Sequence, residues 1–288
     1  MSDGRTRAVT MLVAGACVIG LAPILVRLSA AGPAATGFWR LAFALPLLAL
    51  SSRNEPGGLR GTSRFALMAG AAFALDLACW HYGIANTSVS KASVLANLTP
   101  LVVTAIAWFV FHQKPAPLFL LAVAMSVAGG AVMALSKGAG ITGPNPLLGD
   151  ALSAGTSIWY ALYFLSMGAA RRLQGTRQVM FWSSLTGLPA LLLIAFVLGE
   201  RLVPASPGGW AACVGLGVVH VAGQGSIAWA LGRLPPSTAA VTVLVQPVVT
   251  TAVGWLLFGE LLSARQGAGA ALVLAGVVLA QRASERQA

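Results

Sequence analysis

Charged residues are scarce in this chain of 288 residues: 18 are basic, 7 are acidic, and together they make up 9% of the sequence. A soluble domain has about 25% charged residues. Hydrophobic residues make up 57% instead. A helix needs about 20 apolar residues to cross a hydrocarbon core of about 30 Å, so the chain has room for roughly ten spans joined by short loops. The composition excludes a soluble globule and predicts an all-α membrane protein.

Catalytic and metal-binding patterns are also missing. Cys17, Cys79 and Cys213 are an odd number, and all lie inside apolar stretches, which is typical of small buried side chains. The sequence has no HExxH, GxSxG or Walker motif, and no loop long enough to form a nucleotide-binding domain. We therefore expect neither an enzyme nor a bound metal or cofactor, and no use of ATP within this chain.

The apolar residues fall into ten runs separated by turn and charge clusters. The runs cover roughly 8–29, 34–51, 65–84, 90–111, 116–135, 148–169, 178–198, 210–231, 237–258 and 265–281. The first run follows the basic segment MSDGRTR and is long enough to span, so we expect it to be an uncleaved first helix rather than a signal peptide.

The basic residues gather on one side of these predicted spans. Twelve of the 18 share the side of the N-terminus, namely Arg5, Arg7, Arg53, Arg60, Arg64, Lys114, Arg171, Arg172, Arg177, Arg233, Arg282 and Arg286. The positive-inside rule therefore predicts that both termini are cytoplasmic, in a multi-pass protein of a bacterial inner membrane. It also explains the net charge of +11 without a nucleic-acid partner.

An internal repeat divides the chain into halves. Residues 90–134 superpose without gaps on residues 237–281, with 12 of 45 positions identical, including Pro100 on Pro247 and Trp108 on Trp255. The repeat predicts two five-helix halves, 1–138 and 148–288. Because five is odd, the second half enters the membrane from the opposite side, as in secondary transporters with inverted repeats.

The fifth and tenth predicted spans have almost no polar side chains in their interiors. Small residues recur four apart in both, at Ala122, Ser126 and Gly130 and at Gly267, Ala271 and Ala275. Such spacing permits close helix packing in lipid. We expect these spans to be structural braces or the surface of a homodimer, the alternative being a monomer.

The fourth and ninth spans each contain a proline in mid-span, Pro100 and Pro247. Proline frees the carbonyl four residues earlier, here that of Ala96 or Val243, and paired broken helices are the best pointer to a transporter's binding site. Polar residues accompany both prolines: Ser93, Asn97 and Thr104 in one span, Thr242, Gln246 and Thr250 in the other. A simple packing kink is the alternative interpretation.

Asp76 is the acidic residue that lies well inside a span, where a charge must be paired, hydrated or neutralised by a proton. It is a candidate for binding an amino group or for proton coupling. Arg40 lies at a similar depth on the second span, so the two form a possible charge pair, functional or merely structural. Trp80, His81 and Tyr82 follow Asp76 on the same span.

Further candidate residues occupy the sixth and eighth spans. Trp159, Tyr160 and Tyr163 form an aromatic face, and His220 and Gln224 are one turn apart. A lone histidine in a membrane is more often a hydrogen-bonded core residue than a proton shuttle, although its pKa suits shuttling. With Asp76, Trp80, His81, Tyr82, Asn97 and Gln246, these residues are the predicted substrate-binding set.

The combined pattern resembles the EamA-type branch of the drug/metabolite transporter superfamily over nearly the whole chain. The matching features are Arg40 in the second span, the segments SVSKASVLANLTP and STAAVTVLVQP, and the closing LLFGELLSARQGAGAALVLAGVVLA. Gln113 stands where the first half would carry the counterpart of Glu260, so Glu260 is expected to be a structural residue at a helix end. The resemblance implies a central cavity surrounded by helices 1–4 and 6–9, with helices 5 and 10 outside.

Within this family the chain is most similar in length and style to bacterial exporters of aromatic and neutral amino acids. We therefore expect a secondary transporter that exports amino acids or similar small metabolites by alternating access. Export of drugs or other metabolites, a membrane-embedded lipid-acting enzyme, a passive channel and a scaffold are the alternatives.

Overall fold

The structure is a computed structural model, and it describes residues 3–53, 55, 58–87, 89–136, 143–258 and 263–285. These residues form helices joined by short loops, and the described part contains no strand. The helices are α1 (Asp3–Ile19), α2 (Ala22–Leu28), α3 (Pro33–Ser52), α4 (Arg64–Asn86), α5 (Val89–Ala96), α6 (Thr99–Phe109), α7 (Pro117–Leu135), α8 (Pro146–Arg171), α9 (Thr176–Val197), α10 (Pro207–Val219), the π-helix η1 (His220–Gln224), α11 (Gly225–Leu231), α12 (Pro236–Thr242), α13 (Val245–Phe258) and α14 (Ala264–Glu285).

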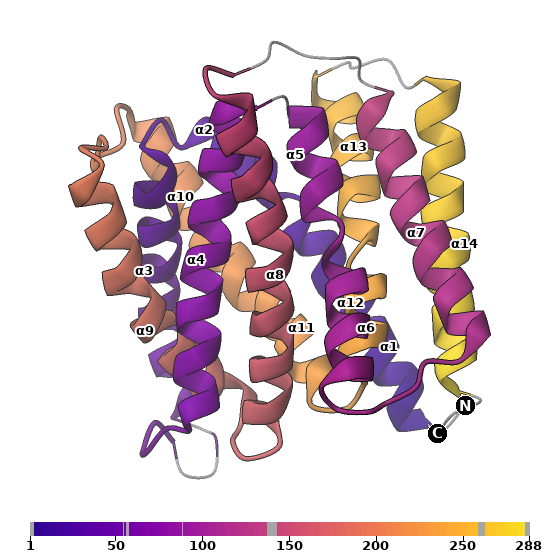
Figure 1. The fold of residues 1–288 in the computed structure, drawn as a ribbon. Coiled ribbons are helices and arrows are strands. Elements are labelled where there is room, and N and C mark those ends of the chain that lie inside the picture. The colour runs from indigo at the N-terminus through magenta and orange to yellow at the C-terminus, as the bar shows by residue number, and fades with distance from the viewer. Residues whose placement is uncertain are drawn as a thin grey trace.

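The helices run roughly side by side in one bundle (Figure 1). Within the described residues, nine helical stretches are long and apolar enough to cross a membrane. Helix α8 is just as long but carries more polar side chains, and it is not one of the nine. The all-α membrane fold is confirmed, whereas the count of ten spans and the inverted repeat stay predictions.

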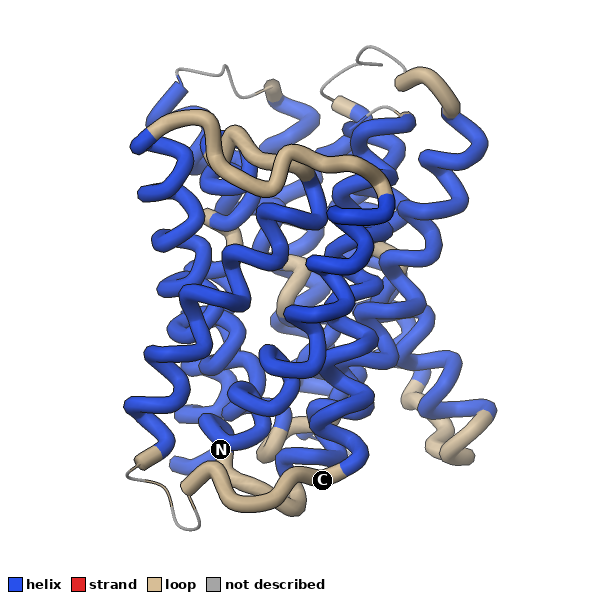
Figure 2. The backbone as a smooth tube through the Cα atoms, turned by 90° about the vertical axis from the view of Figure 1, so that its left-hand side faces the viewer, coloured by secondary structure: helices blue, strands red, loops and turns tan. Residues whose placement is uncertain are grey.

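Both ends of the described chain lie at the same end of the bundle (Figures 1 and 2). An ion pair between Arg5 Nε and Glu285 Oε1, 3.6 Å apart, joins the two terminal helices there. The structure contains no membrane, so the cytoplasmic placement of this end stays a prediction of the positive-inside rule.

Helices α7 and α14 pack against each other at one side of the bundle (Figure 1). A side chain added at Gly129 would begin 2.6 Å from the carbonyl oxygen of Gly269, and one at Gly276 would begin 2.8 Å from that of Ala122. Glycine permits this close approach of two backbones in an apolar bundle. The two contacts are equivalent under the offset of 147 residues that relates the sequence repeats: Gly129 corresponds to Gly276, and Ala122 corresponds to Gly269.

Several bundle helices are interrupted near their middle. Helix α5 ends at Ala96 and α6 begins at Thr99, while α12 ends at Thr242 and α13 begins at Val245. Pro100 and Pro247 lie in the first turn of the second segment in each case, so each break falls where proline excludes the helical hydrogen bond. The eighth predicted span is continuous in direction but contains η1 between α10 and α11.

Candidate polar site

Polar side chains from five segments meet inside the bundle. This polar cluster consists of Arg40 on α3, Asp76 on α4, Tyr160 and Tyr163 on α8, His220 and Gln224 on η1, and Gln246 on α13. Tyr160 lies beside the side chains of both glutamines and within electrostatic reach of Arg40 and Asp76. The cluster therefore unites residues from both predicted halves of the chain.

An aromatic wall supports the cluster. Phe73 of α4 lies at its centre: its ring centroid is 5.2 Å from Arg40 Cζ, 5.0 Å from the Tyr163 ring and 5.4 Å from the His220 ring. Tyr160 stacks on Tyr163 with ring centroids 5.8 Å apart. A guanidinium over an aromatic face is stabilised by the ring's quadrupole, so Phe73 holds Arg40 without neutralising its charge.

The π-helix positions two members of the cluster. His220 Nε2 lies 3.1 Å from Ser184 Oγ on α9, which fixes the plane of the imidazole ring. His220 and Gln224 are 2% and 1% exposed. A π-turn within an α-helix widens the helix locally and is frequent at functional sites, and here it lies where the polar side chains meet.

Several buried polar atoms of the cluster make no hydrogen bond of good geometry within the described structure. They are Arg40 Nε, Tyr163 Oη, His220 Nδ1, Gln224 Nε2 and Gln246 Nε2. The two glutamines lie beside Tyr160, and Gln224 also lies beside Tyr163, so these side chains are neighbours without being fully bonded. Because about 90% or more of buried polar groups in proteins are hydrogen-bonded, this concentration of unbonded polar atoms indicates a place suited to a polar ligand or to water.

Asp76 and Arg40 interact electrostatically but are not in direct contact. Both side chains are buried, and no ion pair within 4.0 Å joins them in the described structure. A buried carboxylate and a buried guanidinium each carry a desolvation cost that only a direct partner offsets, so both groups could still accept a charged or polar partner. The predicted charge pair stays a prediction.

The remaining predicted residues on α4 lie nearer its C-terminal end. Trp80 and His81 pack with ring centroids 5.1 Å apart, and both ring nitrogens of His81 are buried without a hydrogen bond. The Tyr82 hydroxyl donates to the carboxylate of Glu200, in the loop that follows α9. Tyr82 therefore contacts a loop of the second half rather than the polar cluster.

Asn97 and Trp159 also lie outside the polar cluster. Asn97 faces α7, where its Nδ2 lies 3.3 Å from the position a Cβ on Gly130 would occupy. Trp159 interacts with Cys79 on α4. An unbroken helix would place Asn97 on the same face as the other polar residues of the fourth span. The break after Ala96 separates α5 from α6, so Asn97 points to α7 instead.

The carbonyls next to the prolines have local partners. The Ala96 carbonyl accepts a hydrogen bond from the Thr99 hydroxyl at 3.0 Å, and the Val243 carbonyl accepts one from the backbone N–H of Gln246 at 2.9 Å. Each carbonyl oxygen can accept a second bond. These groups are thus already bonded once, and a ligand would be an additional donor.

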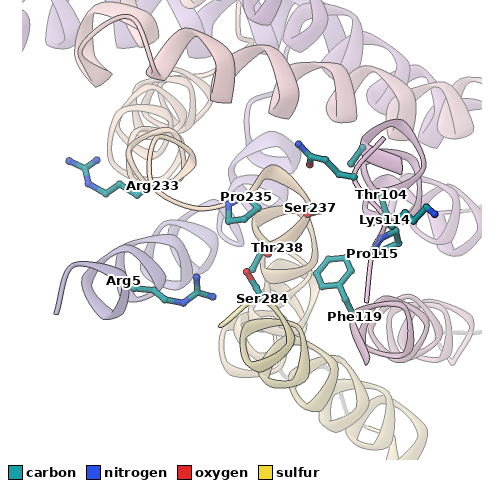
Figure 3. A pocket seen from close by; sticks show the side chains of 12 residues that line it. Arg5, Thr104, Lys114, Pro115, Phe119, Arg233, Pro235, Ser237, Thr238 and Ser284 are labelled. Atoms are coloured by element: carbon teal, nitrogen blue, oxygen red, sulfur yellow. The ribbon is translucent and has the colours of Figure 1, made fainter. Parts of the chain in front are cut away.

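Two cavities open at the end of the bundle that holds the termini. One, of about 380 Å³, is lined by residues of α1, α6, α7, α12 and α14, including Arg5, Thr104 and Thr238 (Figure 3). The other, of about 520 Å³, is lined by residues that include Glu55, Arg177 and Trp229. No member of the polar cluster lines either cavity.

Phe73, Ser184 and Glu200 were not predicted from the sequence as parts of a site. Phe73 and Ser184 are single residues in apolar helices, and only their three-dimensional contacts distinguish them. A signal for Glu200 exists in the sequence, because it is one of only seven acidic residues and follows a span directly.

The sequence of this helical bundle matches a known family of transporters. The model of the EamA-like transporter family matches residues 6–135 and 147–281. The chain belongs to the EamA-like transporter family. The family resemblance expected from the sequence is thereby confirmed.

Named relatives and a solved structure agree with this assignment. The chain is 26% identical over 254 residues to the pseudopaline exporter CntI of Pseudomonas aeruginosa, covering 85% of this chain and 84% of that protein. It is 26% identical over 209 residues to an uncharacterized transporter of Archaeoglobus fulgidus, covering 72% and 73%. A crystal structure of a protein shares the fold with a TM-score of 0.81 and 18% identity, over 98% of this chain and 99% of that chain.

Proposed function

We propose that this EamA-family transporter exports amino acids, aromatic or neutral, or similar small metabolites across a bacterial inner membrane by alternating access. The observation that carries the proposal is the polar cluster, whose buried polar atoms are not fully hydrogen-bonded and lie against aromatic rings. A carboxylate would satisfy Arg40 and the glutamine amides, and an ammonium would satisfy Asp76. The aromatic wall offers an apolar surface to a side chain.

The architecture that supports the proposal is ten spans in two inverted halves, 1–138 and 148–288, with both termini cytoplasmic. In this proposal helix α8 is the tenth span, because its length matches the other spans and two of its polar side chains, Tyr160 and Tyr163, belong to the buried cluster. The two breaks at matched positions of the halves lie beside the prolines of the repeat. Export then requires that the cluster be reached from each side in turn.

Export of another polar metabolite is the second candidate, and one relative favours it. The Pseudomonas aeruginosa relative is a pseudopaline exporter, at 26% identity. The donors of the cluster would bind the carboxylates of any small metabolite, and Asp76 would bind its amines. The identity of the compound that is exchanged therefore separates the two candidates.

Counterflow in proteoliposomes tests the proposal. Vesicles are loaded with one unlabelled compound at a time, drawn from the twenty amino acids and a few cationic dyes. They are then diluted, at two pH values, into buffer that contains a trace of the same compound in labelled form. We expect saturable, transient accumulation of label with aromatic or neutral amino acids. No accumulation with any amino acid would contradict the proposed substrate class, and conductance without saturation would indicate a channel.

A further inference from the structure

The N-terminus of α3 is capped by a carboxylate from the other half of the chain. Glu200, in the loop after α9, accepts hydrogen bonds from the backbone amides of Ala34 at 3.1 Å and Ala35 at 2.9 Å. The N-cap residue of α3 is Gly32, which has no side chain to bond these amides. The first amides of a helix have no partner within the helix, and a carboxylate there is favoured by the helix dipole.

The N-terminus of α9 is capped in the same way from the first half. Glu55, in the loop after α3, accepts from the amides of Arg177 and Gln178, both at 3.2 Å. The N-cap residue of α9 is Gly175. In each helix the two bonded amides are the second and third after the glycine, so each helix is capped by the loop that follows the other.

Both glycines are required by this contact. A Cβ added at Gly32 would collide with the Glu200 carboxylate, and one at Gly175 would collide with that of Glu55. The backbone at both positions is extended with negative φ, −64° and −62°, which other residues adopt readily. Glycine is therefore needed at these positions to make space for the carboxylate, and not to permit the backbone conformation.

A second pair of contacts repeats the pattern. Seven residues after each glycine stands a tryptophan, and Trp39 Nε1 donates to the Leu202 carbonyl at 2.7 Å while Trp182 Nε1 donates to the Leu59 carbonyl at 3.1 Å. Leu202 and Leu59 belong to the loops that carry the two glutamates. Each loop is thus bound twice to the helix of the other half.

From these contacts we propose that α3 and α9 form a fixed axis during transport, held at both ends by Glu200 and Glu55 as positioning residues. The inference rests on the proposed transport function. Alternating access needs an opening at one membrane face and closure at the other. The α3–α9 pair is bonded at both ends in one structure, so we infer that the opening does not run between these two helices.

The interrupted helices are where the movement occurs. The cavity of Figure 3 is lined by residues of α6 and α12, among others, and by none of α3 or α9. The larger cavity is lined by residues of α3 and α9 together with residues of α1, η1 and α11, so it does not separate α3 from α9 at their bonded ends. Breaks after Ala96 and Thr242 leave each helix with a joint at which its two segments can change their angle. The segments α5–α6 and α12–α13 therefore swing against the axis.

Disulfide cross-linking in a variant without the native cysteines tests the axis. The first pair, Gly37→Cys with Leu191→Cys, joins α3 to α9, because a Cβ on Gly37 would lie 3.2 Å from Leu191 Cδ1. The matched pair, Gly20→Cys with Val249→Cys, joins the α1–α2 junction to α13, where the two Cβ atoms would approach to 2.9 Å. Counterflow is measured before and after oxidation and again after reduction.

We expect oxidation of the first pair to change the counterflow rate less than twofold, and oxidation of the matched pair to reduce it at least tenfold, reversibly. A tenfold loss with the first pair overturns the axis. Undiminished counterflow with the matched pair overturns the movement of the interrupted helices.

A distance measurement separates failure of the axis from failure of the proposed function. Spin labels on the exposed residues Leu50, near the inner end of α3, and Leu173, in the turn before α9, report their separation without any substrate. The axis predicts one distance in liposomes, both with no compound added and with each compound of the counterflow panel. Two distances overturn it, whereas one distance in a protein without counterflow supports the axis and contradicts only the proposed substrate class.

Discussion

The cap at the inner end of α9 predicts that Gly175→Ala destabilises the natural protein but stabilises a variant that lacks the Glu55 carboxylate. Replacing Gly175 by alanine removes backbone freedom from the unfolded chain, which stabilises a protein by about 0.4–1 kcal/mol where the native φ and ψ suit alanine. The native values, −62° and 155°, do suit it. The new methyl group, however, collides with the Glu55 carboxylate.

The magnitude follows from what the collision displaces. Glu55 accepts from two amides at 3.2 Å near the protein surface, where a carboxylate at a helix N-terminus contributes about 1 kcal/mol and up to ~2 kcal/mol when partly buried. Gly175→Ala therefore lowers the free energy of unfolding by up to about 1 kcal/mol in the natural sequence. In a Glu55→Ala background no carboxylate remains to be displaced, and the same change raises it by about 0.4–1 kcal/mol.

Unfolding by sodium dodecyl sulfate in mixed micelles, followed by tryptophan fluorescence, measures this double-mutant cycle. The control combines Gly32→Ala with Glu55→Ala, which lie at opposite ends of the bundle, so their effects add within about 0.5 kcal/mol. Equal stabilisation by Gly175→Ala in both backgrounds would show that the Glu55 carboxylate is not held against α9, and the reasoning would fail.

The remaining predictions concern coupling, packing and topology. Asp76→Asn removes the carboxyl group buried in the bundle while the buried histidines His81 and His220 stay, so the part of the pH dependence of counterflow that Asp76 carries is lost; an unchanged pH dependence refutes proton coupling through Asp76. Gly276→Leu drives a side chain into Ser126 and Ala122 of α7 and costs about 1–3 kcal/mol, measured as loss of folded protein after heating. Gly267→Leu on the same helix meets nothing within 4 Å and serves as its control, so equal losses would contradict the packing argument. A fluorescent protein fused to the C-terminus folds and fluoresces if that end is cytoplasmic, and an active periplasmic reporter there contradicts the predicted orientation.

The membrane fold and the helix breaks could be read from the sequence because each depends on local chemistry. Apolar runs of span length require helices, since lipid offers no partner to backbone groups. Pro100 and Pro247 lack the amide of a continuous helix, and the breaks fall two to four residues before them.

The composition of the site was predicted in part. Asp76, Tyr160, Tyr163, Gln224 and Gln246 meet with Arg40, and all are polar or aromatic residues at mid-span. The threonines in the polar stripes of the fourth and ninth spans are not members of the polar cluster. Helical threonine hydroxyls bond their own backbone, as Thr104 does to the Pro100 carbonyl at 2.6 Å.

The sequence does not predict contacts that depend on the folded arrangement. Nothing in HVAGQ distinguishes a π-turn from an α-turn, and the structure shows a π-turn there. Tyr82 and Glu200 are 118 residues apart, and only the fold brings them together. The predicted end-of-helix role of Glu260 lies outside the described residues.

Ligand binding to the purified protein tests the central claim, that the polar cluster is the substrate site. The compound active in counterflow is titrated by calorimetry into the natural protein and into the Gln246→Leu and Gln266→Leu variants; Gln266 accepts a hydrogen bond from the Ser263 amide at the start of α14 and is not a member of the cluster. Loss of one or two hydrogen bonds, each worth about 0.5–1.5 kcal/mol, weakens binding roughly 2- to 100-fold in the first variant. The account predicts that loss for Gln246→Leu and unchanged binding for Gln266→Leu, and equal binding by all three proteins would contradict it.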